Sequence, residues 1–287
     1  MKVLILGVTG MLGSAVFKRL DRDSRYDTSG TMRSAAGMKY FAAEQQTRLI
    51  SNVDVLNADE LTELFVKVKP EVVINCVGLI KQFSSAKDPL ATLPINSLLP
   101  HRLLKLCELT GARLIQISTD CVFSGIKGNY LESDVSDAED LYGKSKYIGE
   151  VTESRYAITL RTSIIGRELN SANSLLDWFL AQQGAVKGYS KAIFSGLPTD
   201  ELANVISDYV IPRSDIYGLY HVSADPIDKF SLLEMVAKEY EKNITLTADP
   251  SFVIDRSLDS TRFRSEVGYN PPSWHALVAN MRKASLI

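Results

Sequence analysis

Cysteine and histidine are scarce in this 287-residue chain, which contains three residues of each. The cysteines, Cys76, Cys107 and Cys121, lack the spacing of metal ligands, and no cluster of His, Asp or Glu residues has that spacing either. We therefore predict no catalytic metal. So few cysteines also suit a reducing compartment, and the expected location is cytoplasmic.

The chain also lacks a dominant charge sign and long hydrophobic runs. Its formal net charge is −2 and its pI is about 6.0, with lysines and arginines scattered along the sequence. This charge balance argues against binding to nucleic acid or to an anionic membrane. No segment approaches the roughly 18 consecutive apolar residues of a transmembrane helix, so we expect no membrane span. The first apolar segment starts at Lys2, which leaves no room for a signal peptide.

A glycine-rich turn stands near the start of the chain, between an expected strand and an expected helix. The apolar run Val3–Leu6 is typical of a strand buried on both faces, and a helical pattern follows the turn. Strand, glycine turn and helix in this order predict a dinucleotide site, with the pyrophosphate on the free N–H groups of the helix. A tight turn without a ligand is the alternative. The expected cofactor contacts here are Gly7, Thr9, Gly10, Met11, Leu12 and Gly13.

The end of the second expected strand carries Arg33 and Ser34 instead of an acidic residue. Dinucleotide folds that select NAD place Asp or Glu there, whereas arginine accommodates the 2′-phosphate of NADP. Arg33 therefore predicts NADPH as the cofactor, with NADH or a merely solvated arginine as the alternatives. Further along, Asp54 and Val55 are placed to meet the adenine edge, unless Asp54 caps the helix that starts near Asp59.

The sequence Tyr142-Gly-Lys-Ser-Lys146 places a phenol and an ammonium four residues apart, so they face the same way on a helix. The lysine charge would lower the pKa of the phenol toward the range useful for proton transfer. An upstream hydroxyl, from Thr119 or Ser118, would complete a site that holds a carbonyl oxygen and protonates it. An exposed helix without chemistry is the alternative for this short motif.

Strand and helix patterns alternate as far as about residue 166. Apolar runs occur at 3–6, 72–77, 113–118 and 156–161, and helical patterns at 13–20, 59–68, 97–109 and 142–153. This alternation predicts an α/β fold with a Rossmann-type doubly wound parallel sheet. Ligands bind such sheets at the carboxyl ends of the strands. Five motifs fall at these ends: Gly7, Arg33, Asn75 to Gly78, Ser118-Thr119, and Arg161 to Ser163.

We expect two domains. Residues 1–165 would form an NADP-binding Rossmann domain and residues 166–287 a smaller α/β substrate-binding domain, with residues 216–223 able to return to the first. The second part shows helical patterns at 175–180, 200–211 and 231–240 and a strand pattern at 218–222. Its tail, from Asp255 onward, looks irregular. Residues 187–196 are interpreted either as a basic and aromatic segment that holds a nucleotide or as an ordinary loop leading into a helix.

Together these motifs resemble the extended short-chain dehydrogenase/reductase family, and within it the dTDP-4-dehydrorhamnose reductase group. The resemblance implies hydride transfer from NADPH to the C4 ketone of a nucleotide-linked 4-keto-6-deoxy sugar, which supplies deoxysugars for surface polysaccharide. It rests on these segments: Gly7 to Gly13, Asn75 to Gly78, Asn96, Ser118 to Phe123, Tyr142 to Lys146, and Arg161 to Ser163.

The resemblance also implies a role for each matching residue. Tyr142 would be the acid, Lys146 would lower its pKa and hold the nicotinamide ribose, and Thr119 rather than Ser118 would bond the reacting oxygen. Asn96 would organise the site. Cofactor contacts near the nicotinamide would be Cys76, Val77, Gly78, Tyr142, Lys146 and Ser163. Substrate contacts would be Thr119, Phe123 and Tyr142. To these we add, from the residues themselves, Lys81 as a cation near the substrate, Cys121 beside the sugar, and Lys191 in the basic segment.

The chain departs from the group's pattern at three places. Phe83 and Ser84 stand where the group usually has an Asp-Lys pair, and Cys121 stands where an aromatic residue often follows the Ser-Thr-Asp motif. The nucleotide is therefore left open between dTDP and UDP, and a homodimer is left open as the assembly. Two other functions also stay open: a sugar-nucleotide epimerase or dehydratase of the same fold, and a non-catalytic NADP-binding regulatory subunit.

Overall fold

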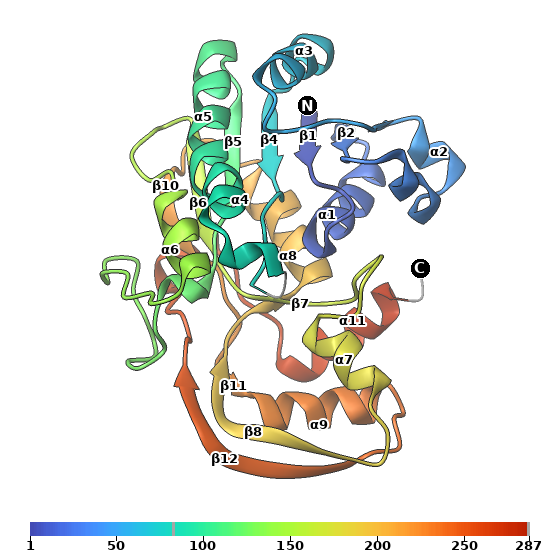
Figure 1. The fold of residues 1–287 in the computed structure, drawn as a ribbon, viewed down its shortest axis with the longest axis vertical. Coiled ribbons are helices and arrows are strands. Elements are labelled where there is room, and N and C mark those ends of the chain that lie inside the picture. Colours follow the sequence, from blue (N-terminus) through green and yellow to red (C-terminus); the bar gives the residue numbers. More distant parts are fainter. Residues whose placement is uncertain (82–83, 286–287) are drawn as a thin grey trace.

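A parallel sheet of seven strands forms the upper part of the molecule (Figure 1). This computed structural model describes residues 1–81 and 84–285. Every neighbouring pair of strands in the sheet is parallel. In spatial order the strands are β10 (Gly218–His221), β6 (Ala157–Arg161), β5 (Arg113–Ile117), β4 (Val72–Asn75), β1 (Lys2–Leu6), β2 (Asp27–Thr31) and β3 (Leu49–Ile50).

Both faces of this sheet are buried by helices. Alternate side chains of β1 point to opposite faces, so Val3 and Ile5 join one hydrophobic cluster while Leu4 and Leu6 join another. The predicted α/β fold with a doubly wound parallel sheet is therefore confirmed. The first cluster includes side chains of α1 (Met11–Asp21), α8 (Thr199–Val205) and α11 (Trp274–Ala284), and the second those of α3 (Ala58–Val68) and α5 (Leu99–Thr110).

The strand order reverses between β1 and β4, and the glycine-rich turn follows β1 at this point. Gly7 has a φ of +85°, a conformation that side chains strongly disfavour. Gly13, in the first turn of α1, lies so close to this turn that an added Cβ would collide with the carbonyl oxygen of Gly7. The two glycines thus let α1 start directly against the end of β1. Ligands bind doubly wound sheets at such a reversal.

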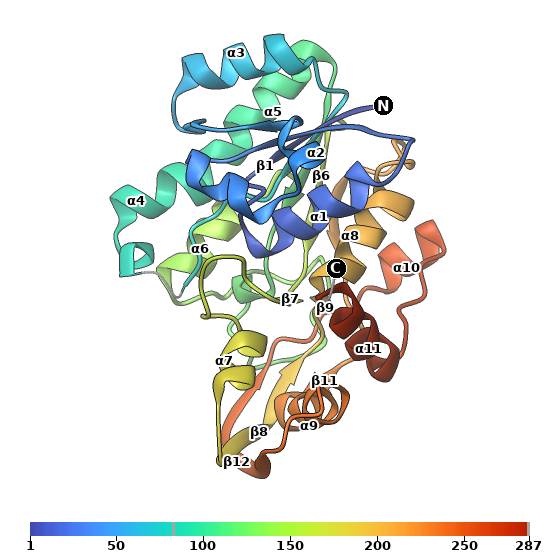
Figure 2. The same cartoon turned by 90° about the vertical axis from the view of Figure 1, so that its right-hand side faces the viewer.

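Below the large sheet, the second half of the chain forms a smaller layered unit (Figures 1 and 2). Strand β8 (Ala185–Phe194) pairs in parallel with β12 (Thr245–Asp255) and antiparallel with β11 (Ile227–Asp228). Helix α9 (Lys229–Glu239) packs on this sheet, where Phe230 lies against the backbone of Gly188. Two short strands, β7 (Ile164–Ile165) and β9 (Leu197–Pro198), pair between the two layers. Helix α7 (Leu175–Ala181) follows β7.

The second half also contributes to the large sheet. Strand β10 forms its edge beside β6, and α8 packs side by side with α1, as Figure 2 shows. The remaining elements are η1 (Ala35–Tyr40), α2 (Ala43–Gln46), η2 (Ser84–Lys87), α4 (Pro89–Leu93), η3 (Pro94–Leu98), η4 (Asp120–Val122), α6 (Leu141–Ile148), η5 (Ile206–Val210) and α10 (Thr261–Val267).

Residues 187–196, for which a nucleotide-holding segment and a loop are both open interpretations, are mostly strand β8, in which buried and exposed residues alternate. Two other expectations about local structure were wrong. The tail is not irregular: α11 starts at the N-cap Ser273 and buries Leu277, Val278 and Met281 on one face. Helix α6 ends at Ile148 and not near residue 153. None of the helices within residues 1–81 and 84–285 is both long and apolar enough to cross a membrane.

We expect Gly13→Ala to lower the free energy of unfolding by about 2 kcal/mol or more, because the new methyl group must push α1 away from Gly7. Gly10→Ala is the matched control. A Cβ at Gly10 meets its nearest neighbour, again the Gly7 oxygen, at 3.4 Å, which is ordinary contact. Urea unfolding of both variants checks this, and equal stabilities would contradict the packing argument.

Candidate active site

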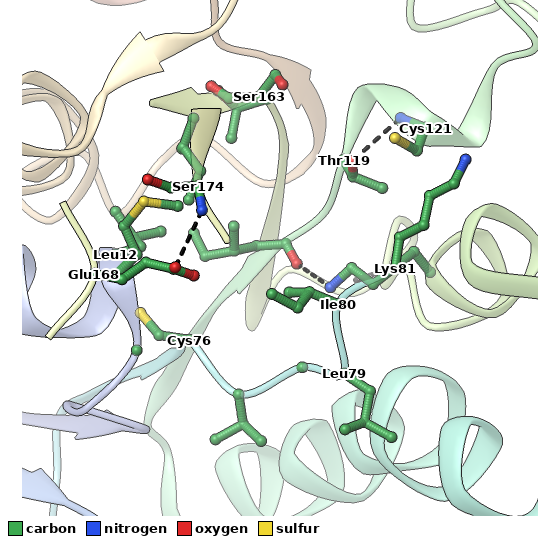
Figure 3. Close-up of a pocket in the computed structure, with 18 of the residues that line it drawn as sticks. Leu12, Cys76, Leu79, Ile80, Lys81, Thr119, Cys121, Ser163, Glu168 and Ser174 are labelled. Atoms are coloured by element: carbon green, nitrogen blue, oxygen red, sulfur yellow. Dashed lines mark hydrogen bonds between the residues drawn. The ribbon is translucent and has the colours of Figure 1, made fainter. Parts of the chain in front are cut away.

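A pocket of about 370 Å³ opens at the carboxyl ends of β1, β4 and β5 (Figure 3). Figure 3 shows Lys81 beside Thr119 and Cys121, with Glu168 and Ser174 on the opposite side near Leu12. The pocket thus brings together segments that are far apart in the sequence. Its lining comprises Thr9, Gly10, Met11, Leu12, Asn75, Cys76, Val77, Gly78, Leu79, Ile80, Lys81, Ile117, Ser118, Thr119, Asp120, Cys121, Tyr142, Lys146, Thr162, Ser163, Ile164, Glu168, Leu169, Asn170, Ser171 and Ser174.

Helix α6 carries Tyr142 into this pocket because its first turn lies directly on the segment after β5. The N-cap Asp140 accepts a hydrogen bond of 2.8 Å from the backbone N–H of Gly143. A Cβ on Gly143 would collide with the carbonyl oxygen of Cys121, so only glycine permits this approach. The close approach brings the Tyr142 phenol within hydrogen-bonding reach of Thr119.

The environment of Tyr142 does not lower its pKa as we expected. Burial raises the pKa of the phenol well above its usual value, and the nearby Cys121, Asp120 and Asp140 raise it further. The hydrogen bond with Thr119 is the one opposing effect among the main causes. Desolvation is the largest cause of the raised pKa, and Lys146 is not among the main causes, so the expected effect of the lysine charge stays a prediction. Tyr142 consequently holds its proton at neutral pH.

Lys146 lies on the same face of α6 and is 8% exposed. Its Nζ donates a hydrogen bond of 2.6 Å to the carbonyl oxygen of Ile117, the last residue of β5. Burial lowers the pKa of Lys146 to about 8, and the negative charge of Glu150 opposes this shift. The ammonium thus stays charged in most molecules at pH 7. A Cβ added to Gly78 would lie 4.0 Å from Nζ, so the segment after β4 passes close to this charge.

The two candidate hydroxyls after β5 face different partners. Ser118 Oγ donates to Glu150 Oε1 at 2.6 Å and is therefore directed into the protein interior. Thr119 Oγ1 lies in the pocket lining, where it donates to Asp120 Oδ1 and accepts from the N–H of Cys121, both at 3.1 Å. The geometry supports Thr119, and not Ser118, as the hydroxyl that meets a ligand.

A buried ion pair lies directly behind these groups. Arg161 Nε and Nη2 each donate to a different carboxylate oxygen of Glu150 at 2.7 Å, and both side chains are at most 3% exposed. His221 Nδ1 faces the carbonyl oxygens of Tyr130 and Asp259, so we assign its hydrogen there and let Nε2 accept from Arg161 at 3.4 Å. Burial lowers the pKa of His221 to about 4. His221 is a core histidine of the scaffold.

Asn96 joins the segment after β4 to α6. Its Oδ1 accepts from the Leu79 N–H at 2.9 Å, and its Nδ2 donates to the Leu79 carbonyl at 3.0 Å and to Ser145 Oγ at 3.1 Å. The side chain is 1% exposed, so its hydrogen-bonding groups are directed to the protein. This arrangement agrees with the expected organising role of Asn96.

The structure brings most of the expected cofactor residues together. The pocket is lined by Thr9, Gly10, Met11 and Leu12 at one end and by Cys76, Val77, Gly78, Tyr142, Lys146 and Ser163 further in, while Gly7 and Gly13 shape the turn from behind. The N-cap of α1 is Gly10, and no side chain caps the N–H groups of that first turn or places a negative charge there. This end of the helix is therefore suited to an anion.

Four further cofactor candidates lie outside the pocket lining. Arg33 is exposed just after β2, and the neighbouring Ser34 caps η1 by accepting from the Ala36 N–H at 3.3 Å. Val55 packs against the hydrophobic cluster of α3. Asp54 accepts from the Leu56 N–H at 2.9 Å in its own turn. The N-cap of α3 is Asn57, so the alternative that Asp54 caps this helix was wrong.

The expected substrate residues divide into two sets. Lys81 and Cys121 line the pocket, and Lys81 Nζ forms an ion pair of 2.7 Å with Asp140. Phe123 was expected there wrongly: it is fully buried and stacked on Tyr130 with ring centroids 4.0 Å apart.

Lys191 also fails to reach the pocket, because it projects from the exposed face of β8. Phe83 and Ser84 stand where the dTDP-4-dehydrorhamnose reductase group usually has an Asp-Lys pair. Phe83 lies outside the described residues, and nothing is described of the Ser84 side chain.

Several groups at the site were missed from the sequence. Glu168 lines the pocket from the loop after β7, and its carboxylate accepts from the N–H groups of Asn173 and Ser174. Asp120 is a pocket-lining carboxyl that is only 7% exposed. Arg256, which follows β12, reaches back so that Nη1 lies 3.7 Å from the Cys121 sulfur.

Only the fold brings Arg256 to the site, since no local pattern marks it. Among the described residues, no group of three His, Cys, Asp or Glu side chains lies close enough to hold a metal ion.

Glu150→Ala should lower the free energy of unfolding by about 3–5 kcal/mol, because it leaves the Arg161 charge buried and unpaired. Replacing both partners, as in Glu150→Leu with Arg161→Met, should cost less than the single change. Urea unfolding of the two variants checks this, and a double variant that is less stable than Glu150→Ala would contradict it.

Known proteins resemble this chain over nearly its whole length. The family model described as RmlD substrate binding domain matches residues 1–286. A dTDP-4-dehydrorhamnose reductase of Aggregatibacter actinomycetemcomitans is 26% identical over 98% of both chains. The crystal structure of a dTDP-4-dehydrorhamnose reductase from Bacillus anthracis, in complex with NADP, superposes with a TM-score of 0.80 at 20% identity and covers 99% of both chains.

A second kind of relative matches only part of its own length. The mouse methionine adenosyltransferase 2 subunit beta is 32% identical over 149 residues, which are 52% of this chain and 41% of that protein. The resemblance to the dTDP-4-dehydrorhamnose reductase group, expected from the motifs, is confirmed by the family model and the first two relatives. The chain belongs to the RmlD substrate binding domain family.

Proposed function

We propose that this protein uses NADPH to reduce the C4 ketone of a nucleotide-linked 4-keto-6-deoxy sugar. The observation that carries the proposal is that one pocket holds a glycine-rich anion cradle at one end and Thr119, Tyr142 and Lys146 at the other. Such a reductase would supply deoxysugar nucleotides of the kind used for surface polysaccharides.

The residues present fit a dinucleotide. The start of α1 offers uncapped N–H groups to a pyrophosphate. Gly13 lies so close to Gly7 that any side chain there would fill the glycine-rich turn. The Lys146 ammonium would hold the nicotinamide ribose beside Gly78. Arg33, exposed at the end of β2, is placed for a 2′-phosphate and favours NADPH over NADH. The NADP named with the Bacillus anthracis reductase supports the same choice.

When bound, NADPH would supply the hydride, and the protein would position the ketone and provide the proton. Tyr142 suits the reductive direction because its raised pKa keeps the phenol protonated at neutral pH. The alkoxide formed by hydride addition would take this proton. Lys146 would hold positive charge beside the phenolate that is left.

The proposed substrate carries its sugar near Thr119 and Cys121. Lys81 and Arg256 place positive charge around that end of the site, which suits an anionic nucleotide-linked sugar. Cys121 occupies little space, so the sugar pocket differs from one with an aromatic residue there. The nucleotide is dTDP or UDP in our proposal, and the reductase relatives support the first.

Two other functions have less support. A dehydratase of this fold needs an acid pair beside the catalytic hydroxyl, whereas Asp120 is followed here by Cys121. Burial raises the pKa of that thiol to about 12, so it cannot replace a carboxyl group. A non-catalytic cofactor-binding subunit is suggested by the partial match to the subunit beta proteins. The intact set of Thr119, Tyr142 and Lys146 favours an enzyme.

Purified protein should oxidise NADPH when it is given dTDP- or UDP-linked 4-keto-6-deoxyhexoses. Tyr142→Phe should bind NADPH as the wild type does but lose activity by about 10²–10⁴-fold, because the general acid is gone. Absorbance at the NADPH band measures turnover, and fluorescence measures binding.

Tyr147→Phe is the matched control, because that tyrosine is 45% exposed on the same helix, and it should leave turnover unchanged. If no sugar in the panel is reduced, the subunit interpretation is preferred. If Tyr142→Phe keeps full turnover, Tyr142 is not the acid.

Arg33→Ala should reduce the preference for NADPH over NADH by about tenfold or more, because an exposed charge-assisted contact to a 2′-phosphate contributes on the order of 1.5 kcal/mol. Arg22→Ala is the control, since Arg22 is an exposed arginine at the opposite end of α1 from the glycine turn. Ratios of kcat/KM for the two cofactors give the measurement. An unaltered ratio in Arg33→Ala would show that this arginine does not read the 2′-phosphate.

A further inference from the structure

Asp120 is a buried carboxyl at the active site that the chemistry above does not use. It is 7% exposed, lines the pocket and follows Thr119 directly at the end of β5. Its Oδ1 accepts the hydroxyl proton of Thr119 at 3.1 Å. A carboxyl group in this position can exist either as an acceptor or, when protonated, as a donor.

The single hydroxyl proton of Thr119 is already committed in this arrangement. A hydroxyl has one proton to donate and two lone pairs that accept. Thr119 Oγ1 gives its proton to Asp120 and accepts the N–H of Cys121 at 3.1 Å. The second lone pair of Oγ1 takes part in neither of these hydrogen bonds. No proton of Thr119 is left to stabilise the oxygen of a ketone undergoing reduction.

The hydrogen bonds of Thr119 change if the Asp120 carboxyl group is protonated. The neutral carboxyl can donate to Thr119 Oγ1, and the threonine proton then becomes available to the pocket. We propose that Asp120 is a positioning residue that sets the direction in which Thr119 donates, so that only the protonated carboxyl lets Thr119 donate to the reacting oxygen. The inference rests on the proposed ketone reduction, because it assigns the donor for that oxygen.

The groups around Asp120 decide how readily it holds a proton. Burial raises the pKa of this carboxyl, which favours the neutral form. Arg256 lowers it through its positive charge, and the hydrogen bonds from Thr119, Cys121 and Ser163 also lower it. Lys229, at the start of α9, is a second cation that faces Asp120 and Cys121. Tyr142, on α6, is neutral at the relevant pH and completes the surroundings.

The proposed role of Asp120 makes kcat depend on pH. The donor form of Asp120 is present below its pKa, so kcat should fall as pH rises through that value, by about tenfold per pH unit. Lys146 has a separate pKa of about 8, and its loss of charge should produce a second fall at higher pH. The wild type should therefore show two descending steps, of which only the lower one belongs to Asp120.

Asp120→Asn tests this, because an amide is neutral at every pH and can still donate to Thr119. We expect a kcat within about threefold of the wild-type low-pH plateau, with the lower step absent and the step near pH 8 retained. Melting temperature and NADPH affinity close to those of the wild type would show that the fold and the cofactor site persist. If Asp120→Asn keeps the lower step, or loses activity by 100-fold at all pH values, the inference is wrong.

Arg256→Met gives a second measurement that leaves Asp120 in place. Removing a cation beside Asp120 raises the carboxyl pKa, so the lower step should move to higher pH while the step near 8 stays. A lower step that does not move would contradict the inference.

A spectroscopic readout separates this inference from the proposed function. The carbonyl stretch of a protonated Asp120 should appear in the infrared difference between wild type and Asp120→Asn and should titrate without any substrate. Thr119→Val should shift this band, because the donated hydrogen bond is lost. If no keto-sugar is reduced but the band behaves this way, the proposed substrate is wrong while Asp120 still donates to Thr119. If Thr119→Val leaves the band unchanged, Asp120 is not the donor.

Discussion

The buried pair of Glu150 and Arg161 is the interaction on which the active site depends. Glu150 follows α6, Arg161 ends β6, and Ser118 at the end of β5 donates to the same carboxylate. Lys146 hydrogen-bonds Ile117, and Thr119 reaches the pocket on the other side of Ser118. Because Ser118 is bonded to this ion pair, the pair fixes the backbone between Ile117, which accepts from Lys146, and Thr119. Such a buried pair is costly to break, because each charge would be left without water or a partner.

The same burial determines which protons the site holds. Desolvation favours neutral forms, so it raises the pKa of Tyr142 and lowers that of Lys146 to about 8. A tyrosine that acts as a base would need the opposite shift. The free protein therefore holds Tyr142 in its protonated form, as the proposed reduction requires. A positive charge beside the tyrosine matters mainly after the proton has left, when it stabilises the phenolate.

Sequence patterns predicted those features of the fold that depend on the order of strands and helices along the chain. The alternating elements specify a parallel sheet, and a parallel sheet necessarily gathers Gly10, Gly78, Thr119 and Tyr142 at one edge. Phe123 was misplaced because a residue four positions beyond Thr119 can face either the pocket or the core, and here it stacks on Tyr130. The tail and β8 were misread because their partners lie far away in sequence: β8 is ordered by β12 and α9, and α11 by α8 and α9.

Arg256 shows why the rest of the site could not be predicted from motifs. It follows the last strand of the smaller sheet, donates to the Phe123 carbonyl at 2.8 Å and comes within 3.7 Å of the Cys121 sulfur. Lys229 approaches the same place from the start of α9. The segment after β5 therefore has one side formed by α6 and the other by the second half of the chain. Arg256 and Lys229 thus place positive charge from the second half of the chain near Asp120, the carboxyl group that we propose sets the direction in which Thr119 donates.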